Sequence, residues 1–141
     1  MLRRSSILGL LAALLASAQT PAKTDLPYLK QAASLIPLEA AEAHGEKGTT
    51  LYTIEGAESP VKTPIPLPIF FLKADKLAPD RLQLYKLDVK GGHRELAEVV
   101  HMEVSKQANG IWKLAAADTL DAGEYALSAG GAGPAFCFQV F

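Results

Sequence analysis

The spacing of turn-forming residues restricts the fold of this chain more than any other feature of its sequence. From Thr49 onward, clusters of Gly, Pro, Asn and Asp recur roughly every 8–12 residues, and the segments between them are rich in β-branched and aromatic residues. Short strands separated by such turns are typical of an all-β sandwich or barrel. We therefore predict a single all-β domain over residues 49–141.

The strands of this domain can be placed from the same pattern. Apolar and polar residues alternate over residues 93–105 as they would in a strand, but residues 94–102 also fit one or two helical turns. Both interpretations remain open. Gly91-Gly92 and Asn109-Gly110 are expected to form tight hairpin turns, which require positive φ. Apolar residues change face within residues 81–90, which predicts a bulge near Leu84. The remaining strands are expected at residues 50–55, 66–73, 111–114, 124–128 and 135–141.

Residues 1–18 have the three parts of a cleavable secretory signal. A positively charged start is followed by an apolar run over residues 7–15 and by small residues at 16–18. The run has about half of the ~20 residues that a transmembrane helix needs. The paired arginines Arg3 and Arg4, which precede the run, indicate twin-arginine export, but the leucine-rich run favours the general secretory route. We expect cleavage after Ala18, a mature protein beginning at Gln19, and a periplasmic or secreted location without a stable membrane anchor.

The expected mature chain is small and weakly acidic. Removal of the signal leaves 123 residues, enough for one domain, and shifts the formal net charge from −1 to −3. Without a Lys/Arg cluster, this balance offers no electrostatic basis for nucleic-acid binding. Residues 19–48 form an N-terminal segment of uncertain structure. Propensity over 38–44 favours a helix, whereas a sandwich would place a first strand there, and we predict the strand.

Cys137 is the only cysteine of the chain. One thiol cannot form an internal disulfide, so the core of an exported domain must hold by packing alone. Either the thiol is reactive, or Cys137 is a small apolar residue within a strand. A buried free cysteine commonly behaves in the second way, which we favour here.

Leu120, Gly123 and Tyr125 together predict a structural corner. A Leu, a Gly and then a Tyr that begins a strand resemble the tyrosine corner of Greek-key sandwiches, in which the phenol bonds to backbone upstream. In antibody-type domains a Cys stands two residues after that Tyr, and Leu127 occupies that place here. The expected architecture is therefore one immunoglobulin-like β-sandwich of about seven strands without the disulfide.

Several segments resemble small exported bacterial β-sandwich proteins of unknown function that carry an L-x-P-G-E-Y-A-L signature. The resemblance rests on residues 56–61, 68–71, 120–127 and 136–138, and it spans roughly Gly56 to Val140. Ala122 replaces the usual Pro of the signature, which loosens the corner without removing it. The resemblance implies the fold and implies no activity.

No catalytic, metal or nucleotide motif is present in the sequence. On one continuous strand His93, Glu95, His101 and Glu103 would share a face, but a tetrahedral metal site needs a third ligand at useful spacing. We interpret these residues as a solvated polar face. Three serines were considered as nucleophiles, and none has a histidine beside it in the sequence: Ser59, Ser105 and Ser128. The sequence implies no cofactor.

Two strands offer candidate sheet edges for a partner. Pro64, Pro66 and Pro68 precede one strand, where they either mark an edge or prevent pairing at it. We hypothesise that one of these two edges, with the Gly-rich tip at 130–133 beside it, binds a partner. The C-terminal strand provides the better test, because it has no proline after Pro134. We expect a non-catalytic binding or envelope-accessory protein, with a small hydrolase or metal-dependent enzyme as the alternative. The residues of the hypothesised edge are Phe136, Phe138, Gln139 and Phe141.

Overall fold

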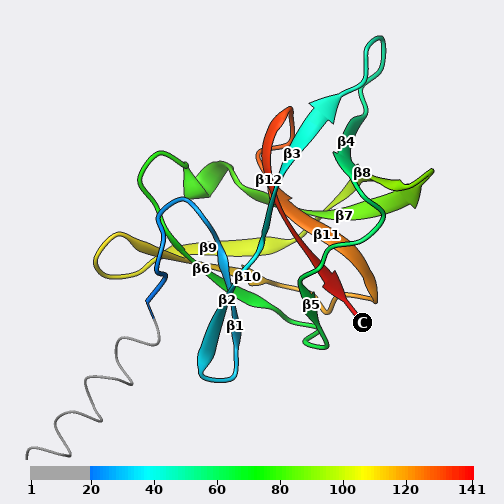
Figure 1. Ribbon diagram of the computed structural model, residues 1–141. Coiled ribbons are helices and arrows are strands. Elements are labelled where there is room, and N and C mark those ends of the chain that lie inside the picture. Colours follow the sequence, from blue (N-terminus) through cyan, green and yellow to red (C-terminus); the bar gives the residue numbers. More distant parts are fainter. Residues whose placement is uncertain (1–19) are drawn as a thin grey trace, which may run out of the picture.

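A computed structural model describes residues 20–141, which form twelve strands and one short 3-10 helix (Figure 1). No α-helix occurs in this part of the chain. The all-β prediction is confirmed, but about seven strands is too low a number. The elements are β1 (Tyr28–Gln31), β2 (Ser34–Pro37), β3 (Glu39–Gly45), β4 (Tyr52–Glu55), β5 (Lys62–Thr63), β6 (Ile69–Lys73), η1 (Pro79–Arg81), β7 (Gln83–Lys90), β8 (His93–Val100), β9 (Met102–Lys106), β10 (Ile111–Ala116), β11 (Gly123–Ser128) and β12 (Gly133–Val140).

The larger sheet closes into a barrel. Its strand order is β11-β7-β8-β4-β3-β12-β5, and β11 also pairs with β12, so six strands form a ring and β5 adds to β12 in parallel. The pairing of β11 with β12 runs antiparallel from Gly123↔Val140 to Ser128↔Ala135. Closure gives these six strands neighbours on both sides, which an open two-sheet sandwich does not do for its outer strands.

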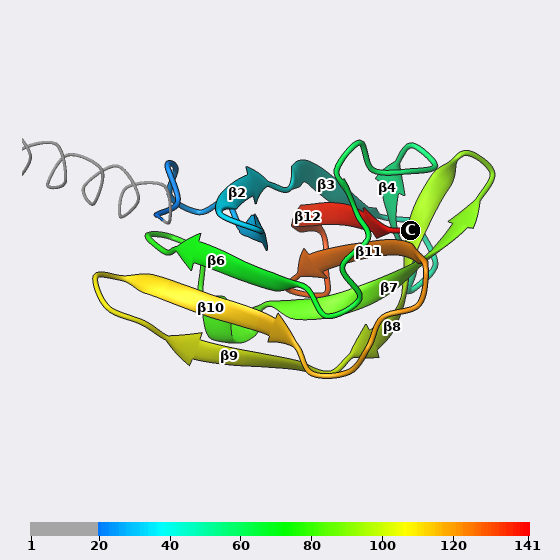
Figure 2. The ribbon, with the colours of Figure 1, turned by 90° about the horizontal axis from the view of Figure 1, so that it is seen from below.

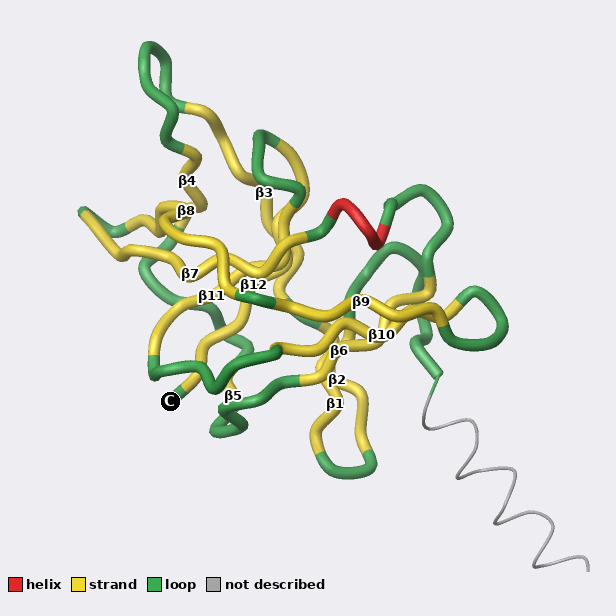
Figure 3. The backbone as a smooth tube through the Cα atoms, turned by 180° about the vertical axis from the view of Figure 1, so that it is seen from behind, coloured by secondary structure: helices red, strands yellow, loops and turns green. Residues whose placement is uncertain are grey.

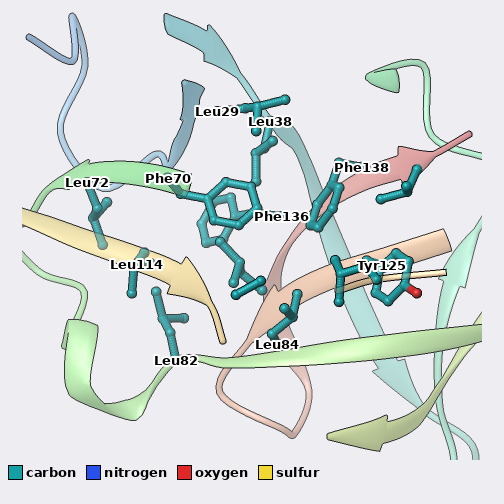
Figure 4. Close-up of a cluster of buried hydrophobic side chains, with 14 residues drawn as sticks. Leu29, Leu38, Phe70, Leu72, Leu82, Leu84, Leu114, Tyr125, Phe136 and Phe138 are labelled. Atoms are coloured by element: carbon teal, nitrogen blue, oxygen red, sulfur yellow. The ribbon is translucent and has the colours of Figure 1, made fainter. Parts of the chain in front are cut away.

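The smaller sheet has the order β2-β1-β6-β10-β9 and is antiparallel throughout. Figure 2 shows β6, β10 and β9 of this sheet side by side. Its inward side chains pack against β7, β11 and β12 of the barrel and form the main core. One aromatic contact joins the layers, because Phe138 on β12 lies 5.0 Å from Phe70 on β6, measured between ring centroids. A second contact, 5.6 Å between the ring centroids of Phe138 and Tyr125, lies between the neighbouring barrel strands β12 and β11. Figure 4 shows this core, whose labelled members are Leu29, Leu38, Phe70, Leu72, Leu82, Leu84, Leu114, Tyr125, Phe136 and Phe138.

The barrel interior forms a second, smaller core. Ala43, Ala126, Ala135 and Cys137 line it together with Ile54 and Leu87. Six strands leave little space inside a closed ring, so small side chains are needed there. The same strands therefore carry large side chains on the outside, towards the smaller sheet, and small ones within.

Strand β7 shows why the sequence pattern changes face. Leu84 packs in the core between the sheets, whereas Leu87 packs inside the barrel, and both are almost fully buried. A register shift does occur, between Lys86 and Leu87, rather than near Leu84 as the pattern predicted. The prediction assumed one buried face, but β7 buries both faces along part of its length, so the apolar residues alone did not locate the bulge.

The local predictions about strands and turns have mixed outcomes. Residues 38–44 largely coincide with strand β3, as expected. Residues 93–105 form two strands, β8 in the barrel and β9 in the smaller sheet, with His101 between them. Both predicted hairpin turns have the required positive φ, with 58° and 80° at Gly91 and Gly92 and 60° and 73° at Asn109 and Gly110.

The chain before β1 is held by one carboxylate. Asp25 accepts hydrogen bonds from the backbone N–H groups of Asp75, Lys76 and Leu77 at 2.8–3.1 Å. Desolvation would raise the pKa of Asp25, but these three backbone bonds outweigh it and lower the pKa. The expected signal sequence, residues 1–18, lies outside the described residues.

Candidate functional site

The outer face of the smaller sheet carries a groove of about 320 Å³, which we call the outer-face groove. It lies between the tips of the β1–β2 and β9–β10 hairpins, whose loops are drawn green in Figure 3. Phe71 and Ile111 form its apolar floor, because they alternate with core residues and so point away from the core. Leu35 adds apolar surface at one side. The groove thus combines apolar contact area with polar backbone at the two hairpin tips.

Three lysines surround the groove floor on the same face. Lys113 is paired directly opposite Phe71, Lys73 is paired opposite Ile111, and Lys30 lines the groove from β1. None of the three pairs with a carboxylate within residues 20–141. The only acidic side chain on this face of β9 is Glu103, opposite Ala115. The face is therefore positively charged, although the whole chain has a net charge of −1.

A buried ion pair lies inside one end of the barrel. Arg94 is 1% exposed and binds both carboxylate oxygens of Glu39, at 2.8 and 3.3 Å. Two further N–H groups of the guanidinium bind the carbonyl oxygens of Glu55 and Gly56, at 2.6 and 2.9 Å. Burial alone would lower the pKa of Arg94, but the hydrogen bond and the charge of Glu39 raise it. This guanidinium fastens β3, β4 and β8 together.

A second carboxylate, that of Glu124, lies in the barrel interior near Arg94. It accepts hydrogen bonds from the backbone N–H of Ser59 at 2.8 Å and from the side-chain amide of Gln139. The Ser59 hydroxyl in turn donates to the carbonyl oxygen of Cys137 at 3.3 Å. Within residues 20–141, the only buried side-chain polar atom without a partner lies elsewhere, on Gln31. Because the cluster is satisfied internally, we interpret it as structural.

The Cys137 thiol lies in this barrel interior and is fully buried. Burial raises its pKa to about 12, although the nearby charge of Arg94 acts in the opposite direction. The thiol is thus protonated at neutral pH and has the small-residue packing role that we favoured from the sequence.

Sequence reasoning missed Arg94, Glu39 and Glu124. A signal was present, because Arg94 has the same parity as the apolar Leu96 and therefore points inward. A charged residue on the inward parity of a strand indicates a buried ion pair or hydrogen-bonded charge. The partner could not be identified that way, since Glu39 is 55 positions from Arg94 in the chain.

The three corner residues lie at the start of β11. Leu120 and Tyr125 are buried in the core between the sheets, and Gly123 is the first residue of β11. The Tyr125 hydroxyl donates to the carbonyl oxygen of Asp121 at 2.8 Å, the upstream backbone bond of a tyrosine corner. Desolvation and the charge of Asp121 raise the pKa of Tyr125. Leu120 and Tyr125 therefore contribute to the fold from buried positions, whereas Gly123 is partly exposed.

The hypothesised C-terminal edge is wrong, because β12 is an internal strand. It pairs with β11 along its length, with β3 over its first half and with β5 at its end. Phe136 and Phe138 belong to the core, and the backbone N–H of Gln139 donates to Val61 at 2.8 Å. Phe141 is exposed, but its N–H donates to Thr63 at 3.0 Å. Ring closure, which the local sequence does not reveal, removes this edge.

The structure separates the residues that a metal ion would have shared. His93 pairs with Glu95 at 3.4 Å on β8, whereas Glu103 lies on β9 in the other sheet, with His101 at the crossing point. No group of three or more potential ligands occurs within residues 20–141. The reason is that the strand is interrupted at His101, where the chain passes from the barrel to the smaller sheet, so the four residues do not share one continuous face.

The structure also places two of the serines considered as nucleophiles and the proline segment before β6. Ser128 is buried and accepts a hydrogen bond from the N–H of Gly130, while Ser105 is exposed on β9. The proline segment is not a free edge, since Pro66 and Pro68 accept backbone bonds from Leu120 and Ala116.

No helix within residues 20–141 has the length and apolar character needed to cross a membrane. Comparisons of the chain with protein-family models, with curated protein sequences and with solved structures gave no match.

Proposed function

We propose that this chain is an exported, non-catalytic binding or envelope-accessory protein that recognises its partner through the outer-face groove. The observation that carries this proposal is the apolar floor of Phe71 and Ile111 beside three lysines without carboxylate partners. A surface of this kind fits a partner that presents an apolar side chain next to an acidic group.

The size and the lining of the groove support recognition. A volume of about 320 Å³ lies at the lower end of the range of ligand sites, roughly 300–1,000 Å³. Lys30 is the one ionisable side chain that lines it, and Ser34, Gln107 and Asn109 supply polar groups at the hairpin tips. These groups can orient a partner by hydrogen bonds, while Phe71 supplies apolar contact.

The proposal predicts that capture of a partner depends on Phe71 and Lys113. Purified protein is immobilised and exposed to native envelope extract, and captured proteins are quantified. Phe71→Ser removes the groove floor, and Lys113→Glu reverses a charge beside it, so each should reduce capture about tenfold, the effect of losing roughly 1.4 kcal/mol of binding. Raising the salt concentration should also weaken capture, because exposed charges are screened.

Matched control variants separate the groove from general surface effects. Leu67→Ser alters another exposed apolar residue, and Lys47→Glu reverses another exposed lysine, both away from the groove lining. Each control should capture as much as the unchanged protein does. Equal losses in the controls and in Phe71→Ser would show that the groove does not determine binding.

The export part of the proposal rests on the sequence of residues 1–18 and predicts a defined mature terminus. Intact-mass measurement of the native protein should give the mass of residues 19–141, with Gln19 first. A native protein that retains Met1 would overturn export by cleavage. The immunoglobulin-like relationship and the relationship to the exported L-x-P-G-E-Y-A-L proteins also remain proposals, supported by the Tyr125 corner.

A further inference from the structure

Strand β9 is a free edge of the smaller sheet. The strand order β2-β1-β6-β10-β9 ends there, and β9 pairs only with β10 among the residues described (Figure 2). The opposite edge, β2, has four residues and ends in Pro37, which has no N–H to donate. Strand β9 has five residues and contains no proline. Of the two edges, β9 is the one suited to accept another strand.

Alternate residues of β9 direct their backbone groups away from β10. Gln107 donates to Ile111 at 2.7 Å, and Ala117 donates to His101 at 3.0 Å, so these positions are hydrogen-bonded across the β9–β10 pair. In an antiparallel pair, hydrogen-bonded positions alternate along the strand, which places Glu103 and Ser105 in the bonded set. The other positions therefore present N–H and C=O groups at the open edge: Met102, Val104 and Lys106.

The core is also incomplete beneath this edge. Met102 and Val104 pack against the main core but remain partly exposed. A cavity of about 190 Å³ lies at the Met102 end of the strand, lined by Leu82, Leu84 and Val100 among others. An added strand with inward apolar side chains would cover Met102 and Val104 and extend into this cavity.

We propose that β9 accepts an extended segment of a partner protein as a sixth, antiparallel strand of this sheet. The segment has apolar side chains opposite Met102 and Val104 and an acidic side chain opposite Lys106. Antiparallel pairing follows the other four pairs of the sheet. The acidic position follows from Lys106, which is exposed, lies 5.9 Å from the Trp112 ring centre and has no carboxylate partner in residues 20–141.

A second copy of this chain fits the edge less well. Two β9 strands paired antiparallel about Val104 would place Lys106 of each copy opposite Met102 of the other. Neither lysine would then meet a carboxylate, and the charged end of each would be brought towards the apolar cavity at Met102. This edge differs from the outer-face groove, so the inference goes beyond the function proposed above.

The test uses a synthetic peptide with the core Glu-Thr-Val-Lys-Leu, labelled with a fluorophore and flanked by Gly and Ser. Antiparallel to β9, it places Glu opposite Lys106, Val opposite Val104 and Leu opposite Met102. We expect saturable binding by fluorescence anisotropy, and slowed hydrogen exchange at the amides of Met102, Val104 and Lys106. A peptide of equal composition with the core Glu-Lys-Val-Leu-Thr should bind about tenfold more weakly, because its two apolar side chains are adjacent and face opposite sides in every register.

Variants at the edge test the geometry without disturbing the β9–β10 pair. Val104→Pro removes an N–H that β10 does not use, so the fold should survive while peptide binding weakens about tenfold through the lost hydrogen bond. Val104→Thr keeps the N–H and should retain binding. Lys106→Glu should weaken binding of this peptide and favour one with Lys in place of its Glu. This charge exchange stays informative if Val104→Pro fails to fold.

Three results would overturn the proposal. One is the absence of binding to the folded, unchanged protein, and another is equal binding of the matched and rearranged peptides. The third is a dimer in solution that Val104→Pro converts to a monomer, which would assign the edge to a second copy. Phe71→Ser, which disrupts the groove, should bind the peptide unchanged, so failure of one proposal is distinguishable from failure of the other.

Discussion

Replacing Arg94 with alanine should lower the free energy of unfolding by about 3–5 kcal/mol, because it leaves the carboxylate of Glu39 without its charged partner. The carbonyl oxygens of Glu55 and Gly56 also lose their donors, and the barrel gains an empty volume where a fully buried side chain stood. Part of the Glu39 side chain, 23%, reaches water, which favours the lower end of this range. Urea denaturation followed by Trp112 fluorescence measures the change.

A double substitution provides the control for Arg94. Arg94→Met with Glu39→Leu removes both charges and keeps apolar volume, so it should recover much of the stability that Arg94→Met alone loses. A single Arg94→Ala variant that unfolds within about 1 kcal/mol of the unchanged protein would contradict a structural role for this pair.

Replacing Gln139 with proline should prevent stable folding, because it should lower the free energy of unfolding by about 3 kcal/mol or more. The substitution removes the backbone N–H that donates to Val61, and it leaves that carbonyl oxygen without its donor. It also removes the side-chain amide that binds the buried carboxylate of Glu124. Proline is tolerated in edge strands and bulges, whereas here β12 has neighbours on both sides at this position. Circular dichroism and thermal melting of purified protein measure the outcome.

Gln139→Ala separates the contributions of backbone and side chain. Alanine keeps the N–H to Val61 and loses the side-chain amide contacts to Glu124 and, at 3.4 Å, to Glu58. This variant should therefore fold, with a free energy of unfolding lowered by about 1–3 kcal/mol. If Gln139→Pro instead folds as stably as Gln139→Ala, the C-terminal half of β12 would be an open edge after all.

Much of the local structure could be predicted from the sequence, because its causes are local. Asn109-Gly110 and Gly91-Gly92 favour positive φ wherever they occur in a chain, so the two hairpin turns could be placed. Alternating apolar residues similarly indicated strands in most of residues 49–141. Tyr125 stands at the position of a corner residue, and its hydroxyl bonds only four residues upstream, to Asp121.

The candidate groove could not be predicted in the same way. Its floor and its sides come from the β1–β2 hairpin, from β6 and from β10 with the loop that precedes it, three segments that are distant from one another in the chain. Phe71 and Lys113 become neighbours only through the pairing of β6 with β10. Single lysines on separate strands do not indicate a binding site in the sequence, because only the register of the sheet places them around one apolar patch.

The sequence by itself determined the all-β class, the positions of most turns and the segments in which apolar and polar residues alternate. Only the tertiary structure decided which strands are edges and which residues face a second core. Pairing of β11 with β12 closes the ring and makes Phe136, Phe138 and Gln139 internal, while it leaves β9 open. The physical reason is that strand pairing depends on contacts between distant segments, and its outcome reflects the packing of the whole domain. Where both faces of a strand are buried, as in β7, β11 and β12, alternation no longer shows which face is the core.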